Sequence, residues 1–245
     1  MKLIVKYVLL LALVFIHGCA YDTKIPLDTL VYKSDTPIKN KNTKLIILLR
    51  GFGNDINYFD IQGWTDALQD KYPHYTLVIP DMHFGYYQND TFALRLKQDV
   101  ITPALKKGYQ SIWIVGISMG GLGAIMTSDA YPDDIERLYL YAPYLGGGTI
   151  TAQIERAGGL AAWQPDSADS EKWQYKLWQR MQFLTQHANS PVPVYLGYGS
   201  DDDMVGLPLL AAALPADQVV TANGGHRDWV FTALFQEMLE RGFFE

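Results

Sequence analysis

Short runs of apolar residues recur along most of the chain, separated by mixed segments whose apolar residues fall three or four positions apart. The continuous runs have strand length and are typical of strands buried on both faces. They lie at 45–49, 75–79, 112–115, 138–141, 192–196 and 219–220. The mixed segments have the spacing of amphipathic helices. They predict helices at 63–71, 91–107, 119–131, 171–187, 205–214 and 228–241.

Strands that alternate with helices predict an α/β fold, in which a mostly parallel central sheet carries helices on both faces. Pro103 lies inside the second predicted helix and should distort it, because proline has no amide hydrogen to donate. Ligands bind such sheets at the carboxyl ends of the strands. The residues that directly follow each strand are therefore the first candidates for chemistry.

The first twenty residues follow a different pattern. Lys2 and Lys6 precede a ten-residue apolar run at 7–16, which is too short to cross a bilayer as a helix. The end of this segment, Gly18-Cys19, resembles the bacterial lipoprotein signal, which implies cleavage after residue 18 and lipidation of Cys19. Cys19 is also the chain's single cysteine, so no disulfide explains it. An ordinary secretory signal cut nearby and an uncleaved anchor are the alternatives.

The expected organisation is a signal peptide at 1–18, an N-terminal linker and edge segment at 19–43, and one globular domain at 44–245. The protein is then exported to the cell envelope and held on a bacterial membrane through Cys19. Of the 245 residues, 49% are hydrophobic, enough for a full core. The 26 acidic residues outnumber the 20 Lys and Arg, giving a formal charge of −6. Without a basic surface, nucleic acid is not an expected partner.

A possible nucleophile follows the third predicted strand. Gly116-Ile117-Ser118-Met119-Gly120 is a Gly-x-Ser-x-Gly sequence between a buried strand and a helix, where small residues let a sharp turn present the serine. A glycine-rich turn that merely packs a helix on the sheet is the alternative. A serine hydroxyl needs a neighbouring base to take its proton. His226 follows the last strand and two glycines, so it is the expected base.

An acidic side chain should orient the histidine and stabilise its charged form. Asp201, Asp202 and Asp203 follow the strand at 192–196 and lie between Ser118 and His226 in the chain. These acids could also form a solvated turn or a helix cap.

The order serine, acid, histidine on alternating strands and helices resembles the α/β-hydrolase family over nearly all of 44–245. That family often shows Gly-x-x-Asp-x-x-Val after the strand that bears the acid. Gly199, Asp202 and Val205 match this pattern, so the resemblance implies Asp202 as the third member of the triad.

Two backbone amides should stabilise the oxyanion that forms during acyl transfer. Met119, directly after the nucleophile, is expected to supply one. Arg50-Gly51-Phe52-Gly53 resembles the family's His-Gly-x-Gly, which implies the amide of Phe52 as the second donor, with Arg50 in place of the usual histidine. The alternative for Phe52 is a core aromatic residue before a turn.

About fifty residues separate the strands at 138–141 and 192–196, more than a single crossover helix requires. A helical cap is therefore expected at about 145–190, with Gly146 to Gly148 as a hinge. Its aromatic residues either line a pocket or belong to ordinary amphipathic helices. The candidate pocket residues are His83, Tyr86 and Trp163.

The sequence thus predicts a serine hydrolase that cleaves a carboxylic ester or thioester, with a small-molecule or lipid-like substrate. The expected residues are Ser118, Asp202 and His226, with the amides of Phe52 and Met119, and no metal or organic cofactor. Acyl transfer and peptide cleavage could use the same triad. A catalytically silent envelope protein that keeps the fold and binds a partner is the alternative from another class.

Overall fold

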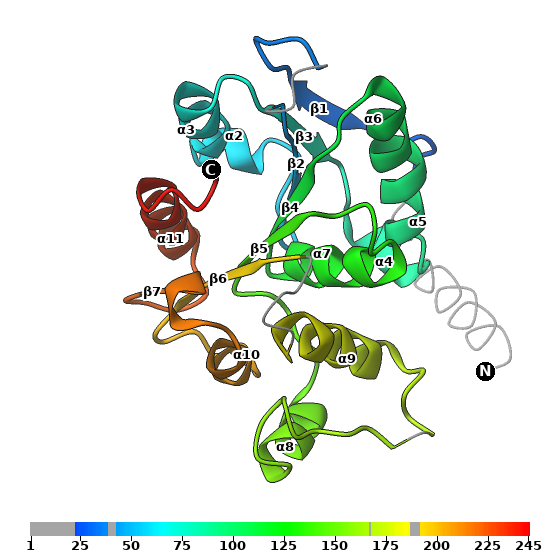
Figure 1. The fold of residues 1–245 in the computed structure, drawn as a ribbon, viewed down its shortest axis with the longest axis vertical. Coiled ribbons are helices and arrows are strands. Elements are labelled where there is room, and N and C mark those ends of the chain that lie inside the picture. The colour runs from blue at the N-terminus through cyan, green and yellow to red at the C-terminus, as the bar shows by residue number, and fades with distance from the viewer. Residues whose placement is uncertain (1–22, 39–42, 167, 187–191) are drawn as a thin grey trace, which may run out of the picture.

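The computed structural model describes residues 23–38, 43–166, 168–186 and 192–245. A seven-stranded sheet forms the centre of the fold (Figure 1), in the order β1-β3-β2-β4-β5-β6-β7. Only β1 runs antiparallel to its neighbour, and the other pairs are parallel. The strand bounds are β1 Thr29–Tyr32, β2 Leu45–Leu49, β3 Thr76–Pro80, β4 Ile112–Ile117, β5 Arg137–Tyr141, β6 Val194–Gly199 and β7 Val219–Ala222.

Helices cover both faces of the sheet. In Figure 1, α2, α3 and α11 lie on one side and α4 to α7 on the other, while α8, α9 and α10 lie near the β6 end. The bounds are α2 Tyr58–Ile61, α3 Trp64–Lys71, α4 Phe84–Gln88, α5 Phe92–Leu96, η1 Lys97–Ile101, α6 Thr102–Lys107, α7 Met119–Ala130, α8 Gly148–Arg156, α9 Trp173–Gln186, α10 Leu207–Ala213, η2 Ala216–Gln218 and α11 Asp228–Glu240. This is the predicted α/β-hydrolase architecture.

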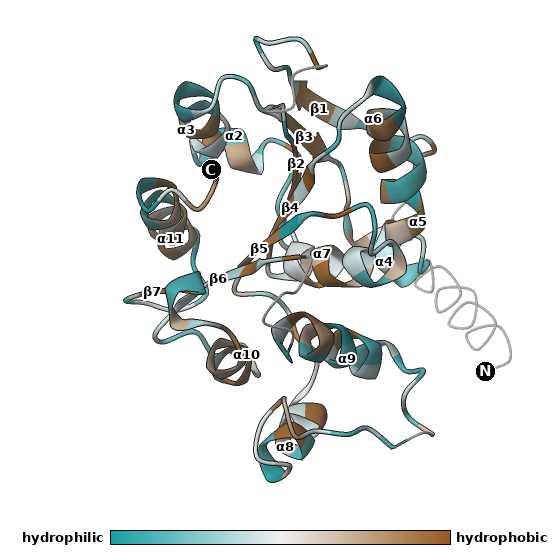
Figure 2. Ribbon diagram, in the orientation of Figure 1, coloured by the Kyte–Doolittle hydropathy of each residue, from teal (hydrophilic) through white to brown (hydrophobic). Residues whose placement is uncertain are grey.

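The central strands are buried because helices cover them on both sides. Every residue of β2, β3 and β4 is buried, which confirms the prediction made from their continuous apolar runs. Figure 2 shows these strands as the most hydrophobic part of the fold, with hydrophilic residues on the outer helices. Rings extend the core beyond the sheet. Trp64 of α3 stacks on Phe235 of α11 with ring centroids 4.3 Å apart, which joins two helices on one face.

The sheet register aligns the ends of the strands. Leu49 lies opposite Gly116, Tyr141 opposite Gly197, and Gly199 opposite Ala222. Because these pairs are parallel, the loops that follow β2, β4, β6 and β7 all leave from the same edge. The positions singled out in the sequence therefore meet at one edge.

The sequence prediction lacked β1, α2, α4 and α8. β1 alternates exposed and half-buried residues at the edge of the sheet, so it has no continuous apolar run. α2 and α4 have four and five residues, too few for a helical period to stand out.

The helix predicted at 91–107 is confirmed with the expected disturbance near Pro103. Its middle turn, η1, is a π-helix, and Pro103 is the second residue of α6. Proline cannot donate to the carbonyl four residues earlier, and its ring crowds that carbonyl. The wider turn directly before Pro103 relieves this crowding.

The predicted signal at 1–18 and the anchor at Cys19 lie outside the described residues. Within the described ranges, no helix combines the length and apolar character needed to cross a membrane. The segment expected to form a cap contains α8 and α9, and α9 packs against α7, the helix that follows Ser118. Movement of this segment over the site stays a prediction.

Candidate active site

Ser118 occupies a strained turn between β4 and α7. Its backbone angles are φ 54° and ψ −113°. Residues with a Cβ rarely adopt this region. The turn is fixed to the end of β5, because Ser118 N donates to Tyr141 O at 2.9 Å and Tyr144 N donates to Ser118 O at 2.9 Å. The surrounding structure thus imposes a costly backbone conformation, which is typical of functional sites.

The two glycines of the motif are required by close backbone contacts. A Cβ atom on Gly116 would lie 2.4 Å from Gly120 O, and one on Gly120 would lie 2.1 Å from Leu49 O. Either contact is far below van der Waals distance and involves backbone atoms that cannot rotate away. Glycine therefore lets α7 begin directly over the ends of β2 and β4, as the sequence motif predicted.

We expect Gly120→Ala to lower the free energy of unfolding by about 3 kcal/mol, because the new methyl group must displace the β2 backbone. This corresponds to a fall in Tm of roughly 9 °C for a protein of this size. Gly148→Ala is the matched control, since no atom lies within 4 Å of its added Cβ. Thermal unfolding followed by circular dichroism measures both. Equal Tm values for the two variants would contradict the packing argument.

His226 and Asp202 form a direct pair. His226 Nδ1 donates to Asp202 Oδ2 at 2.9 Å, and the second carboxylate oxygen accepts from Met204 N at 3.0 Å. The Asp202 side chain has no exposed area, whereas the His226 side chain is 26% exposed. The ring also meets Phe231 edge-on, with centroids 4.9 Å apart. The bond to Asp202 fixes the tautomer, so the Nε2 atom of neutral His226 is free of a proton and can act as a base.

The acid loop and the histidine loop are joined through their backbones. Ser200 N donates to Ala222 O at 2.8 Å, and Asp201 N donates to Gly224 O at 2.9 Å. A Cβ atom on Gly199 would lie 2.1 Å from Gly224 O, so only glycine permits this approach. Among the three acids, Asp202 alone points inward to the histidine, while Asp201 and Asp203 are exposed.

The loop after β2 lies directly beside the nucleophile. A Cβ atom on Gly51 would be 3.6 Å from Ser118 Cβ, which brings the predicted donor Phe52 to the site. The Phe52 side chain is 61% exposed and meets Phe84 edge-on at 5.2 Å, so the alternative of a core aromatic residue is wrong. Met119 is the first residue of α7. Amides in a first helical turn lack intrahelical partners, so its amide can serve an oxyanion.

The structure does not join all three predicted catalytic side chains by hydrogen bonds. Within the described residues, no hydrogen bond connects the Ser118 hydroxyl to His226. Contacts of this kind are often long in unliganded enzymes and shorten when substrate binds. The sheet order brings Ser118 and the Asp202–His226 pair to one edge of the sheet. A hydrogen bond between the Ser118 hydroxyl and His226 stays a prediction.

The three candidate pocket residues have different environments. His83 lines a cavity next to Arg50, and its Nδ1 accepts from Gly85 N at 3.2 Å. Tyr86 is 1% exposed, and its hydroxyl donates to Lys24 O at 3.0 Å. Trp163 is 2% exposed and stacks on Tyr175. Neither Tyr86 nor Trp163 lines that cavity, because both are packed in the protein interior.

Two polar contacts near the site were missed by sequence reasoning. Arg50 is 7% exposed, and its Nη2 donates to Asp81 Oδ1 at 2.5 Å, joining the ends of β2 and β3. Tyr58 donates to Asp228 Oδ1 at 3.0 Å and so connects the loop region after β2 with the start of α11, two residues beyond His226. Burial, followed by the charge of Asp228, raises the pKa of Tyr58, which keeps its hydroxyl protonated. Arg50 directly follows β2 and Asp81 directly follows β3, and these positions in the sequence could have predicted the Arg50–Asp81 contact.

The sequence matches the model of one known protein family. The sequence profile of the family described as "Putative esterase" matches residues 98–240, more than half of the chain and a range that includes Ser118, Asp202 and His226. The chain belongs to this esterase family. Among curated proteins, no sequence matches it significantly.

Solved structures share the fold of this esterase family member at low sequence identity. Est1E from Butyrivibrio proteoclasticus, with ferulic acid bound, is 19% identical with a TM-score of 0.54, covering 89% of this chain and 96% of its own. FphF, a fluorophosphonate-binding serine hydrolase of Staphylococcus aureus, is 13% identical with a TM-score of 0.57, covering 89% and 91%. The S-formylglutathione hydrolase FrmB of the same organism is 13% identical with a TM-score of 0.53, covering 87% and 96%.

Proposed function

We propose that the protein is a serine hydrolase that cleaves a carboxylic ester or thioester through an acyl-enzyme on Ser118. The observation that carries the proposal is the 2.9 Å contact between His226 Nδ1 and the fully buried Asp202 carboxylate. A buried carboxylate that holds one ring nitrogen of a part-exposed histidine leaves the other nitrogen available for proton transfer. Membership of the esterase family supports the same reaction class.

The reaction follows from the placement of these groups. Ser118 Oγ attacks the carbonyl carbon while His226 Nε2 takes its proton, and Asp202 stabilises the resulting imidazolium. The amides of Phe52 and Met119 stabilise the negative charge that develops on the carbonyl oxygen. His226 then protonates the leaving alcohol or thiol. Water, deprotonated by the same histidine, releases the acid and restores Ser118.

A fluorophosphonate probe tests the proposal directly, because it reacts with an activated serine. We expect covalent labelling of the folded protein, with the added mass on the peptide that contains Ser118. Labelling should disappear after heat denaturation, since the free serine is a weak nucleophile. Folded protein that stays unlabelled would favour the rival function, a catalytically silent envelope protein that binds a partner.

Substrate identity is tested with an ester panel. Est1E was solved with ferulic acid, so aromatic acyl esters belong beside aliphatic esters and thioesters. Measuring transfer to added alcohols distinguishes a hydrolase from an acyltransferase that uses the same triad. A lipid anchor at Cys19, with export to the cell envelope, is a separate proposal supported by the resemblance of residues 1–19 to a lipoprotein signal.

A further inference from the structure

The loop that is expected to carry the second oxyanion donor has few attachments of its own. It covers residues 51–57, between β2 and α2. Its side chains are exposed or half-buried, and the Phe52 side chain is 61% exposed. Among the described residues, no hydrogen bond involves the backbone of Gly51, Phe52 or Gly53. The Phe52 amide is therefore available to an oxyanion, but its position depends on the residues that hold the two ends of the loop.

Buried side chains hold both ends of this loop. Tyr58, the first residue of α2, donates to Asp228 at one end. At the other end lies Arg50, whose side chain is 7% exposed. The Arg50 carbonyl oxygen lies against the first turn of α7, since a Cβ atom on Gly120 would be 2.7 Å from it. Arg50 is thus the residue nearest to Phe52 in the chain that has a buried side chain.

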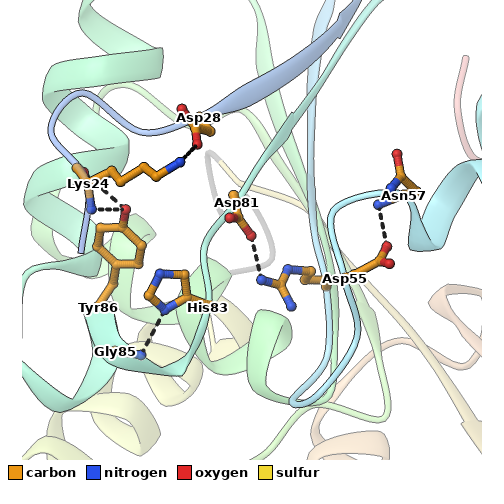
Figure 3. A network of polar contacts seen from close by, with 9 residues as sticks. Lys24, Asp28, Asp55, Asn57, Asp81, His83, Gly85 and Tyr86 are labelled. Atoms are coloured by element: carbon orange, nitrogen blue, oxygen red, sulfur yellow. Dashed lines mark hydrogen bonds and ion pairs between the residues drawn. The ribbon is translucent and has the colours of Figure 1, made fainter. Parts of the chain in front are cut away.

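One contact fixes the Arg50 guanidinium. Its Nη2 atom donates to Asp81 Oδ1 at 2.5 Å, and Asp81 directly follows β3. Figure 3 draws this contact as the dashed line at Asp81, between the chain after β3 and the loop with Asp55 and Asn57. The ion pair therefore ties the start of the Phe52 loop to the end of a neighbouring strand.

This guanidinium is costly to bury. The Asp81 side chain is 33% exposed, so water weakens the attraction within the pair. The Nε atom of Arg50 is buried and has no hydrogen-bond partner in the part of the chain that the structure describes. A buried donor without a partner lowers stability, and an apolar side chain of similar size would avoid this cost. Packing alone therefore does not explain a charged group at this position.

We propose that Arg50 is a positioning residue, whose bond to Asp81 holds the Phe52 amide in the orientation that an oxyanion requires. The inference rests on the proposed function, because it concerns the transition state of that same site. In this role Arg50 acts through Phe52 and does not touch the reacting atoms. A displacement of about 1 Å at a catalytic group can cost roughly 100-fold in rate. Loss of one oxyanion donor costs a similar factor.

Arg50→Met tests this role, because it removes the guanidinium and keeps an unbranched apolar side chain. We expect kcat for a simple 4-nitrophenyl ester to fall about 100-fold, since the oxyanion donor is displaced. KM should change by less than about threefold, because the donor acts mainly in the transition state. Lys97→Met is the matched control. Lys97 pairs with Asp134, which precedes β5 at the edge opposite to Ser118, so this variant should keep the wild-type kcat.

An inhibitor that mimics the transition state separates this role from general damage. Ser118 Oγ adds to the carbonyl carbon of a trifluoromethyl ketone, the C=O π electrons move to the oxygen, and His226 takes the serine proton. The resulting oxyanion needs the same two amides. In Arg50→Met its Ki should rise about 100-fold, by the factor by which kcat/KM falls. The matched methyl ketone binds mainly without this addition, so its Ki should stay within about threefold.

The Asp81 partner provides a second series, which does not depend on the folding of an Arg50 variant. Asp81→Leu removes the acceptor and should lower kcat about 100-fold. Asp81→Asn keeps a side-chain oxygen for Nη2 and should lose less than about tenfold. The double variant Arg50→Met/Asp81→Leu should be no slower than either single variant, because each alone already breaks the bond. With both charges removed, its Tm should stay within about 3 °C of the wild-type value.

Failure of this inference is distinguishable from failure of the proposed function. The positioning role is wrong if kcat of Arg50→Met stays within about threefold of wild type, or if Lys97→Met loses as much. Equal increases in Ki for the two ketones, or equal losses in the two Asp81 variants, would also contradict it. An Asp81→Asn enzyme faster than wild type would mean that the Arg50 charge acts directly on the oxyanion. Absence of both wild-type turnover and fluorophosphonate labelling would overturn the proposed function, and the inference with it.

Discussion

Replacing Ser118 with alanine should lower kcat for ester hydrolysis by about 10⁶-fold, the scale measured when the nucleophile of a serine protease is removed. The change deletes the attacking oxygen and leaves the binding surfaces in place. The turn at Ser118 has φ 54°. Alanine keeps the Cβ atom, so this strained backbone carries the same cost in both proteins. Steady-state kinetics on a matched ester, with circular dichroism to verify folding, provide the measurement.

Ser111→Ala is the control for this change. Ser111 directly precedes β4, at the end opposite to Ser118, and its buried hydroxyl has no hydrogen-bond partner among the described residues. The two variants therefore remove the same atom from the two ends of one strand. If Ser118→Ala kept more than a tenth of the wild-type kcat, Ser118 would not be the nucleophile.

Replacing Asp202 with asparagine should lower kcat by about 10⁴-fold, because the amide favours the wrong histidine tautomer. In the native protein the carboxylate accepts from His226 Nδ1, which keeps the proton off Nε2. Asparagine can donate to Nδ1 instead, so Nε2 would carry the proton and could not act as a base. Rates measured across pH, together with fluorophosphonate labelling, distinguish a lost base from a lost binding surface.

Asp201→Asn and Asp203→Asn are matched controls for this prediction. Both side chains are exposed, and both lie next to Asp202 in the same loop. They should change kcat by less than about threefold, since exposed charges interact weakly through water. A large loss in Asp201→Asn with normal activity in Asp202→Asn would show that the acid was assigned one residue too late.

The sequence predicted much of the site because its residues follow strands. Gly116, Ser118 and Gly120 form a recognisable motif between a strand and a helix, and the structure shows the close backbone contacts that require glycine at 116 and 120. His226 and one of three acids followed from their positions after the last strands. The choice of Asp202 among the three required the family resemblance. The three aspartates differ in burial, which three identical adjacent residues in a sequence do not reveal.

Other features depend on packing that the sequence pattern does not encode. Tyr86 follows a strand like His83, yet it turns inward and bonds to the backbone of Lys24. Tyr58 and Asp228 are 170 residues apart, so their contact arises only when α2 meets α11. β1 has no continuous apolar run because it lies at the sheet edge, with one neighbour instead of two.

Backbone hydrogen bonds join the loop that holds Asp202 to the end of β7 and the loop that holds His226, so this proposed catalytic pair lies at the edge of the sheet. β7 is a four-residue strand with a single neighbour, and the loop after it holds His226. The amide hydrogens of edge strands exchange with solvent through local unfolding that leaves the central strands folded. Activity should therefore be lost at a lower denaturant concentration than the one at which the central strands unfold. The midpoint of inactivation would then report local unfolding of β7 and of the loop that follows it.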